Sequence, residues 1–381
     1  MPRELIALVI VACTLGLSCS NQTNSNKDSP HGIEEHIVYA KGFTLTRFNN
    51  YTKIKVYNPW QQAKKVNLEY YLVNRNDSVP AELKEKEIIR TPISKIICMS
   101  TTHLGFLSAL DEVSSIQAIS GTKYASNPEI IKRINNNEIK EIGYEQALNY
   151  ELILKLKPDL IMVYGVNGEV TGTINKLKEL GIQVVLNGEY LEETPLAKAE
   201  WIKFMGSFFN KQQKATSYFN TIEQNYKAIC KAVESVKKKP FVLTGLPYKD
   251  TWWMSGGNSN LATLIRDAGA NYLWKENQSR ESFAVALEEV AIRSLTADYW
   301  INSGTANTLS DILAADSRIA TFPPVKKRTI FNNNLISSAE GGNDYWERGV
   351  VRPDLILADL VKIFHPELAN DTIYNFYKPL R

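Results

Sequence analysis

Short apolar runs alternate with amphipathic stretches along most of the chain from residue 95 onward. KIICMS (95–100) and IQAIS (116–120) are typical of short buried strands, and NPEIIKRI (127–134) repeats apolar residues at helical spacing. NYELILKLKPDLIMV (149–163) predicts an amphipathic helix, a Lys-Pro break and another buried strand. Helices alternating with short apolar strands indicate a largely parallel sheet that is covered on both faces.

A long helical stretch separates this pattern from a second copy of it. Residues 194–238 repeat apolar side chains at helical spacing, over a length well beyond the usual helix of about 11–12 residues. We expect either one long helix or a broken pair. The α/β rhythm restarts at PFVLTGLP (240–247) and ends in the amphipathic helix RPDLILADLVKIFHPEL (352–368). Two similar lobes joined by a helix leave a cleft, where ligands tend to bind.

The segment before this rhythm is β-rich. HIVYAKGF (36–43), YTKIKVYN (51–58) and VNLEYYLV (66–73) are rich in β-branched and aromatic residues. They predict a β meander on the edge of the first lobe, followed by a solvated connection at AELKEKE (81–87). The expected fold class is therefore α/β, with two Rossmann-like lobes at 36–193 and 239–381, parallel sheets, and a connecting helix at 194–238.

The N-terminus is typical of a lipoprotein signal peptide. Arg3 precedes thirteen uncharged residues from Leu5 to Leu17, which are too few to span a bilayer as a helix of roughly 20 residues. Small residues before Cys19 predict that this cysteine is acylated, so that 1–19 is the signal and the polar residues 20–35 are a tether. Cys13 is a competing site, and cleavage without lipidation is the alternative. The expected location is the cell envelope, on the periplasmic side, anchored to the membrane by lipid.

The amino-acid composition limits the classes of partner that this protein is expected to bind. The 44 basic and 41 acidic residues nearly balance, which argues against nucleic acid and against a strongly charged ligand surface. The two cysteines beyond the signal, Cys98 and Cys230, lie in apolar runs and are expected to be buried thiols. No cofactor is expected.

The sequence lacks the motifs of common enzymes. It has no Gly-rich phosphate loop followed by lysine and no G-x-S-x-G elbow. Its four histidines stand at positions 31, 36, 103 and 365, too scattered to favour a zinc site. For His103, at a helix start, capping or packing is favoured over metal ligation. We therefore expect a binding protein that is not an enzyme and has no metal site of its own.

Five segments resemble a known family in the expected order: IICMSTTHLGFLSALDEVSSIQAIS, EIGYEQALNYELILKLKPDLIMV, GGNSNLATLIRDAGANYLW, VALEEV and RPDLILADLVKIFHPEL. Together they span about 95–367 and resemble the periplasmic-binding proteins for iron–siderophore complexes and cobalamin. The resemblance implies a monomer with ligand capture between two lobes and delivery to an ABC permease in the inner membrane.

The resemblance also implies docking residues. In this family one glutamate on each lobe meets arginines of the permease, and the matching positions here are Glu151 and Glu288, although Glu289 is adjacent to the second. Two separated charges would fix orientation on a two-fold partner. The alternative is that each carboxylate only favours the dipole at a helix N-terminus.

The resemblance further implies ligand contacts, because Tyr144, Tyr164 and Phe283 match positions where the cobalamin binders carry aromatic residues. Other aromatic residues that cluster in loops are also expected to contact the ligand. Their faces suit a large planar ligand, an anionic group of which Arg348 could hold, and alternation points only one of Trp252 and Trp253 into the cleft. The full set of expected contacts is Tyr124, Tyr144, Tyr164, Trp252, Trp253, Phe283, Tyr345, Trp346 and Arg348.

These residues leave the ligand open between an iron–siderophore complex and a corrinoid, with heme also compatible. A second hypothesis is a heme- or siderophore-binding lipoprotein at the outer membrane that works with a β-barrel receptor. A third is a hydrolase that acts on a chelate, which the scarcity of histidine disfavours.

Overall fold

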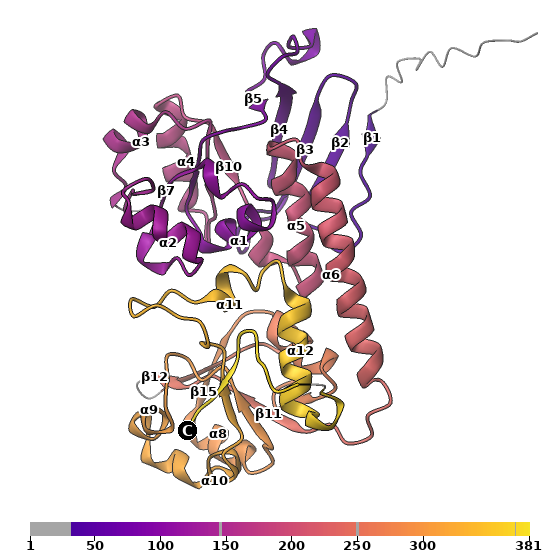
Figure 1. Cartoon of the computed structure of the whole chain (residues 1–381), viewed down its shortest axis with the longest axis vertical. Coiled ribbons are helices and arrows are strands. Elements are labelled where there is room, and N and C mark those ends of the chain that lie inside the picture. Colours follow the sequence, from indigo (N-terminus) through magenta and orange to yellow (C-terminus); the bar gives the residue numbers. More distant parts are fainter. Residues whose placement is uncertain (1–31, 145–146, 249–250, 370) are drawn as a thin grey trace, which may run out of the picture.

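A computed structural model describes residues 32–144, 147–248, 251–369 and 371–381. Two α/β lobes lie one above the other, with one long helix along the side of both (Figure 1). Cys19, the predicted signal and most of the predicted tether lie outside the described residues. Within the described ranges, no helix combines the length and apolar character that a membrane crossing needs.

The first lobe is built on a five-stranded parallel sheet in the order β10-β9-β6-β7-β8. Three of its strands consist only of buried residues, as the apolar runs predict. The strands are β6 (Ile96–Cys98), β7 (Ile116–Ile119), β8 (Lys140–Glu141), β9 (Leu160–Val163) and β10 (Val184–Leu186). The helices are α1 (Thr101–Ala109), α2 (Pro128–Asn135), α3 (Tyr150–Leu156) and α4 (Val170–Glu179).

A second sheet precedes the first lobe and shares a hydrophobic core with it. Four strands form the predicted antiparallel meander, and a fifth adds in parallel. They are β1 (Ile33–Glu34), β2 (Phe43–Arg47), β3 (Thr52–Tyr57), β4 (Asn67–Asn74) and β5 (Ile88–Thr91). Because β1 pairs with β2, the sheet extends into residues that the sequence assigned to the tether.

Residues 36–42 were expected in a strand, and that prediction is wrong. The amides of Val38, Tyr39 and Ala40 donate to the buried carboxylate of Glu200, at 2.7–3.1 Å. Those of residues 41 and 42 donate to Glu192 in the same way. Carboxylates therefore satisfy the backbone donors that a neighbouring strand would otherwise bind.

The connection between the lobes is a broken pair of helices, α5 (Pro195–Phe208) and α6 (Gln212–Val233). The break contains Asn210 in the left-handed conformation (φ 57°), which asparagine tolerates better than most residues. α5 is buried in the first lobe, whereas α6 runs along the side and packs on α5 and α12.

The second lobe repeats the plan with a sheet in the order β14-β11-β16-β17-β18, parallel except for β18. Its strands are β11 (Phe241–Thr244), β14 (Asn271–Tyr272), β16 (Tyr299–Ile301), β17 (Ile330–Asn332) and β18 (Lys378–Pro379). A small antiparallel sheet adds β12 (Pro247–Tyr248), β13 (Thr251–Met254) and β15 (Phe283–Ala286). The helices are α7 (Asn260–Asp267), α8 (Leu287–Ser294), α9 (Leu309–Ala315), α10 (Pro323–Lys327), α11 (Asp344–Glu347) and α12 (Pro353–Phe364).

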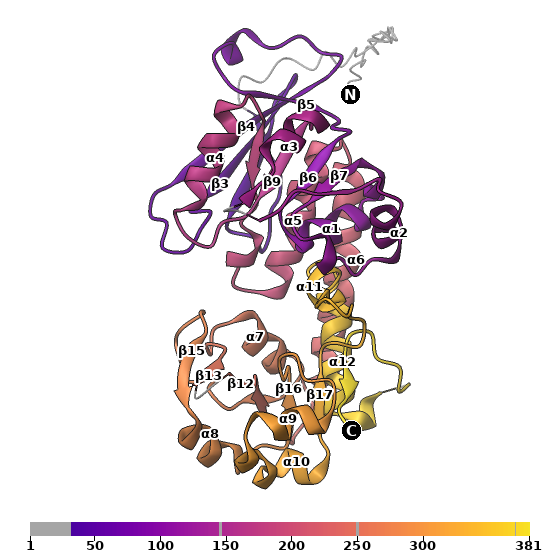
Figure 2. The same ribbon diagram turned by 90° about the vertical axis from the view of Figure 1, so that its left-hand side faces the viewer.

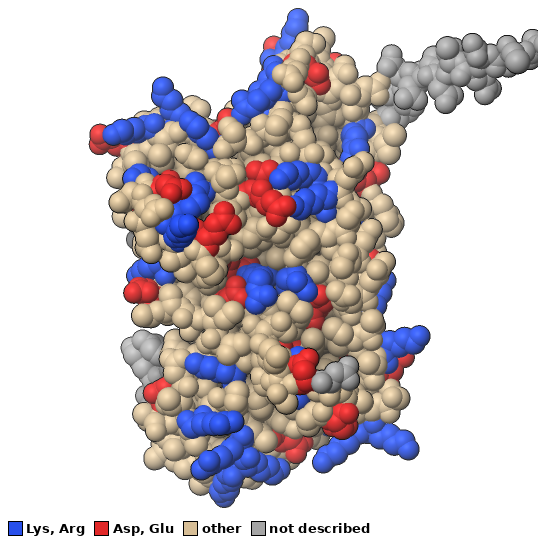
Figure 3. Space-filling view, viewed as in Figure 1, with Lys and Arg blue, Asp and Glu red and all other residues tan. Residues whose placement is uncertain are grey.

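The two lobes meet at α11, which lies between them in both orientations (Figure 2). On the face shown in Figure 3, both acidic and basic side chains are present on each lobe. Cys98 is buried and Cys230 partly buried, and both are free thiols.

Candidate functional site

A cavity of about 540 Å³ opens at the carboxyl ends of the second lobe's parallel strands. Thr244 ends β11 and Gly245 follows it, Asn302 follows β16, and Asn333 follows β17. The carboxyl ends of parallel strands meet at one edge of a sheet, which is where α/β proteins usually bind ligands. The fold therefore brings these loops together at the lobe interface.

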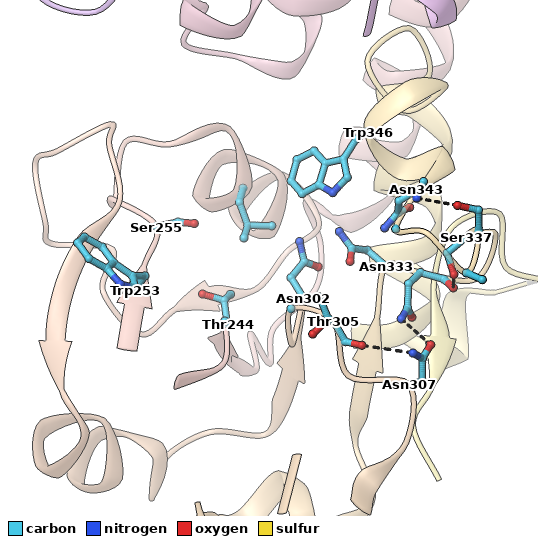
Figure 4. A pocket seen from close by; sticks show the side chains of 18 residues that line it. Thr244, Trp253, Ser255, Asn302, Thr305, Asn307, Asn333, Ser337, Asn343 and Trp346 are labelled. Atoms are coloured by element: carbon cyan, nitrogen blue, oxygen red, sulfur yellow. Dashed lines mark hydrogen bonds between the residues drawn. The ribbon is translucent and has the colours of Figure 1, made fainter. Parts of the chain in front are cut away.

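No lining residue of this cavity is charged, among the 18 described residues that form its wall (Figure 4). Ten of them are asparagine, serine or threonine, and four are glycine. The polar ones are Thr244, Ser255, Asn302, Thr305, Asn307, Asn333, Asn334, Ser337, Ser338 and Asn343. The wall thus offers neutral hydrogen-bond donors and acceptors.

Hydrogen bonds within the lobe fix the orientation of several asparagines. Asn302 Oδ1 accepts a bond from the Tyr377 hydroxyl at 2.7 Å, and the Asn302 side chain is also hydrogen-bonded to Tyr345. Asn334 Nδ2 donates to Ala306 O at 3.1 Å and to Asn307 Oδ1 at 3.0 Å. Its own buried Oδ1 has no partner within the described part of the chain. Hydrogen bonds within the lobe thus hold Asn302 and Asn334 in fixed orientations at the cavity wall.

Two tryptophans flank the cavity. Trp253 of β13 is 54% exposed and Trp346 of α11 is 58% exposed. Trp346 lies above Asn302 and Asn333 in Figure 4, with Trp253 at another side. Large exposed aromatic faces beside neutral amides suit a ligand that combines a flat apolar body with polar substituents.

A smaller cavity of about 330 Å³ adjoins the first and lies between the lobes. Both cavities are lined by Ser255, Leu261, Asn302 and Trp346. The residues that the smaller one adds come from both lobes: Thr102, Glu189, Tyr190, Pro195, Lys198, Asn260, Leu264, Tyr345, Gly349, Val350, Pro353 and Ile356. We call it the interlobe cavity.

A buried carboxylate holds α11 against the first lobe. Glu347 accepts bonds from Ser126 N at 2.6 Å, Ser126 Oγ at 2.9 Å and Asn127 N at 3.1 Å. Burial raises the pKa of Glu347, although these bonds oppose the shift. An added Cβ on Gly105 of α1 would lie 2.1 Å from Glu347 O, so the close approach of the two helices requires glycine. Trp346 is thereby positioned by contacts to both lobes.

Three of the predicted contacts line the cavities. Trp253 and Trp346 do so with exposed rings, whereas Tyr345 is 6% exposed and packs edge-on against Phe376 and Tyr377. Their contact with a ligand stays a prediction.

Four other predicted contacts line neither cavity. The buried position of Trp252 contradicts its expected contact, whereas contact of Phe283, Arg348 and Tyr164 with a ligand stays a prediction. Trp252 is fully buried, and its indole donates to Thr244 O at 3.0 Å, because alternation along β13 turns it into the core. Phe283 of β15 packs on the same core. Arg348 binds Asp344 at 2.7 Å and lies over the Phe376 ring. Tyr164, just after β9, is partly buried outside the cavity walls.

Tyr124 and Tyr144 form a pair on the first lobe, with ring centroids 6.5 Å apart. Both are partly exposed but line neither cavity. An added Cβ on Gly341, a lining residue, would lie 3.7 Å from the Tyr124 ring. The pair is thus next to the larger cavity.

Glu151 and Glu288 lie in the first turns of α3 and α8, on different lobes. Both are exposed. Glu288 pairs with Arg318 at 3.0 Å, and Glu289 pairs with Arg293 at 3.0 Å. Their role in docking stays a prediction.

His103 is fully buried in α1, and burial lowers its pKa to about 3, so the ring is neutral. The described residues contain no group of three or more His, Cys, Asp or Glu side chains placed to hold a metal ion. Both ring nitrogens of His103 are buried without a hydrogen-bond partner within the described part of the chain.

Sequence reasoning missed the asparagines of the cavity and the contact made by Glu347. A signal for the asparagines existed, because Asn302 and the run Asn332–Asn334 directly follow or end apolar strands. Polar residues at the carboxyl ends of parallel strands are candidates for ligand contacts.

Comparison with known proteins is consistent with this architecture. A family model described as periplasmic binding protein matches residues 96–332. An uncharacterised lipoprotein of Methanocaldococcus jannaschii is 28% identical over 389 residues, covering 95% of this chain and 91% of the relative.

Solved structures share the fold at low identity. A periplasmic heme-binding protein from Pseudomonas aeruginosa has a TM-score of 0.58 at 15% identity, covering 75% of this chain and 97% of that one. A protein of an ABC-type Fe3+-hydroxamate transport system from Saccharomonospora viridis has a TM-score of 0.53 at 19% identity, covering 72% of this chain and 94% of that one.

Proposed function

Because the chain belongs to the periplasmic binding protein family, we propose that it is the substrate-binding lipoprotein of an ABC importer. Binding, and not catalysis, is the activity of this family. The adjoining cavities at the lobe interface are the proposed capture site. The lipoprotein name of the archaeal relative supports the proposed anchor at Cys19 and a location in the cell envelope.

Our proposal about the ligand rests on one observation, which is that the wall of the larger cavity is uncharged. Heme carries carboxylates, for which proteins usually supply arginine, and its iron is held by His, Cys, Met or Tyr. The larger cavity has none of these among its described lining residues, and the interlobe cavity adds only two tyrosines of this set, Tyr190 and Tyr345. A corrinoid is a flat macrocycle rimmed by neutral amides, which pair well with asparagine. We therefore favour a corrinoid such as cobalamin.

A neutral ferric hydroxamate is the second candidate. Its hydroxamate oxygens carry the iron, so the protein needs no metal ligand of its own, and its periphery is polar and uncharged. The structural likeness to the Fe3+-hydroxamate transport protein supports this second candidate.

Delivery of the ligand to the permease would use the two exposed glutamates, Glu151 and Glu288. Glu151 and Glu288 stand on separate lobes, each at a helix N-terminus, and two separated charges fix the orientation of a docking partner. The proposed partner is an ABC permease that offers a basic residue to each lobe.

The ligand proposal is tested by fluorescence titration of the purified full-length chain with cyanocobalamin, hemin and a neutral ferric hydroxamate. We expect saturable quenching by cyanocobalamin, weakened in Trp253→Ala and Trp346→Ala. Trp60→Ala is the matched control, because Trp60 lines neither cavity. A response to hemin or to the hydroxamate alone would reject the corrinoid assignment.

A further inference from the structure

Two runs of basic residues lie at the same end of the second lobe. Residues 237–239 (Lys-Lys-Lys) form the loop before β11, and residues 326–328 (Lys-Lys-Arg) close α10 and precede β17. All six side chains are exposed. Both strands pair in parallel with β16, so the two runs come together at the amino edge of the sheet, away from the cavity at its carboxyl edge. Figure 3 shows basic side chains gathered over α10 at this end of the lobe. We call these six residues the basic edge.

One acidic residue joins the loops of the basic edge. Asp298, just before β16, accepts a bond from Phe241 N at 3.0 Å through its Oδ2. Its Oδ1 lies 3.7 Å from Lys327 Nζ, and its carbonyl oxygen accepts a bond from Thr329 Oγ1 at 2.6 Å. The loops that carry the two basic runs are therefore held side by side.

The basic edge borders a hollow and has few acidic partners. A cavity of about 540 Å³ is lined by Lys237, Lys238 and Lys327 together with two acidic residues, Asp298 and Glu367. Within the described part of the chain, Lys327 is the one member of the basic edge that has a carboxylate in ion-pair range. The other five cations come from two parts of the chain and give this end of the lobe a positive potential, which attracts anions.

Apolar side chains are exposed at the same edge of the sheet. Phe241, the first residue of β11, is 39% exposed, and Leu295, in the connection from α8 to β16, is 64% exposed. Leu295 precedes the strand that lies between β11 and β17, so its loop stands between those of the two basic runs. Basic side chains around exposed apolar ones are typical of surfaces that contact anionic membranes, because the cations bind lipid phosphates while the apolar groups enter the interface.

The proposed docking geometry brings this edge near a bilayer. Glu288, the proposed permease contact of the second lobe, lies at the opposite end of α8 from Leu295. At about 1.5 Å per residue, the helix between them spans roughly 10 Å. A lobe that docks on a membrane permease through Glu288 therefore holds the basic edge close to the lipid around that permease.

We propose that the basic edge is a contact surface for the phosphates of anionic phospholipids, with Phe241 and Leu295 at the lipid interface. An acidic protein would also match the charges, but the proposed lipid anchor and the permease both place a bilayer within reach. The contact orients the second lobe on the membrane while the ligand is delivered. This inference rests on the proposed function for the presence of a bilayer, and it gives these residues no part in ligand capture.

The test is cosedimentation of the full-length chain with vesicles of phosphatidylcholine, either alone or with one third phosphatidylglycerol. We expect binding to the anionic vesicles to be tighter by about tenfold or more, and this preference should shrink at high salt, which screens exposed charges. Replacing residues 237–239 together by glutamine should remove most of the preference. The matched control replaces three exposed lysines of the first lobe by glutamine and should retain it; these are Lys64, Lys84 and Lys132.

Hydrogen exchange on the same vesicles locates the contact, and it does so independently of the apolar N-terminal run, which is identical in every variant. Exchange in residues 236–241 and 326–329 should slow on the anionic vesicles and not on phosphatidylcholine alone. Lys326→Gln leaves the contact between Asp298 and Lys327 in place, and we expect it to reduce the preference for anionic vesicles severalfold.

Equal losses in the basic-edge variant and the control variant would overturn the proposal, as would exchange in these two segments that anionic vesicles leave unchanged. Binding to polyglutamate with no preference for phosphatidylglycerol would reject the lipid and assign the surface to an acidic protein. Each of these results leaves the proposed function standing, because ligand capture is tested by the cyanocobalamin titration, in which no vesicle is present.

Discussion

At the scale of single residues, the site depends on asparagine and tryptophan more than on charge. Asn302 is the clearest case, because it occupies a left-handed position (φ 52°) directly after β16 and gives its carbonyl oxygen to Tyr377. Few other residue types combine tolerance of this conformation with an amide donor. We expect the NH2 group, which lies at the cavity wall beside Tyr345, to donate to a ligand carbonyl.

Replacing Asn302 by Asp tests this reading. Aspartate keeps the size, tolerates the left-handed conformation and still accepts from Tyr377, but it replaces the donor with a charged acceptor. We expect cyanocobalamin affinity to fall about tenfold in a calorimetric titration, with little loss of stability. Asn210→Asp is the control, because Asn210 is also left-handed (φ 57°) and lines neither cavity. An unchanged dissociation constant for Asn302→Asp would show that this amide does not face the ligand.

Local patterns predicted some of these residue environments and missed others. Alternation along β13 separated buried Trp252 from exposed Trp253. The i, i+4 spacing of Asp344 and Arg348 is typical of an ion pair, which the structure contains. The environment of Glu189 could not be predicted from the sequence. Its neighbours in the cavity come from distant parts of the chain, and their positions depend on how the lobes meet.

At the scale of elements, short apolar strands and amphipathic helices were predictable because each pattern is local. Segment 36–42 was not, since its β-like composition is overridden by two carboxylates about 150 residues away in sequence. The contacts of Asp159, at the start of β9, were not predictable either. Its carboxylate accepts bonds from the backbone just before β6 and from Arg75, which follows β4 of the N-terminal sheet.

Asp159 gives a pH-dependent prediction. Although burial opposes it, bonds from Ser94 N (2.6 Å), Ser94 Oγ, Lys95 N and Arg75 lower the pKa of Asp159 below its usual value of 3.8. The anion therefore stabilises the fold above the unfolded pKa, and this contribution is lost as pH falls through the folded pKa.

Urea unfolding of Asp159→Asn checks this. We expect the free energy of unfolding to fall by about 1 kcal/mol at neutral pH and by less at acidic pH. The effect is modest because the carboxylate is partly exposed. Asp77→Asn, in an exposed turn, should change neither value. A loss for Asp159→Asn that does not vary with pH would show that the charge of this side chain is not what stabilises the contact.

At the scale of the whole molecule, the contact between Glu347 and residues 126–127 sets how the lobes meet. The long α6 alongside both lobes and this buried carboxylate both resist a large hinge motion. We infer that ligand binding changes the lobe arrangement little. Small-angle scattering with and without cyanocobalamin should give nearly superimposable curves, and a marked contraction would contradict this.

Glu347→Gln tests the contact itself. The amide keeps one acceptor but places an NH2 group against the donors at Ser126 and Asn127, so these backbone amides should exchange hydrogen faster. Hydrogen exchange read by NMR or mass spectrometry reports this directly. Glu340→Gln, exposed in the same loop, should leave the exchange of residues 126–127 unchanged.

The central claim is that the larger cavity, with its uncharged wall at the carboxyl ends of the second lobe's strands, selects a neutral, amide-rimmed ligand. The most direct measurement is calorimetric titration of the full-length chain with cyanocobalamin and with hemin, each at low and high salt. The account predicts saturable binding of cyanocobalamin with a dissociation constant that hardly changes with salt, because no charged lining residue of the larger cavity contributes. Tighter binding of hemin, or cyanocobalamin binding that weakens steeply with salt, would contradict it.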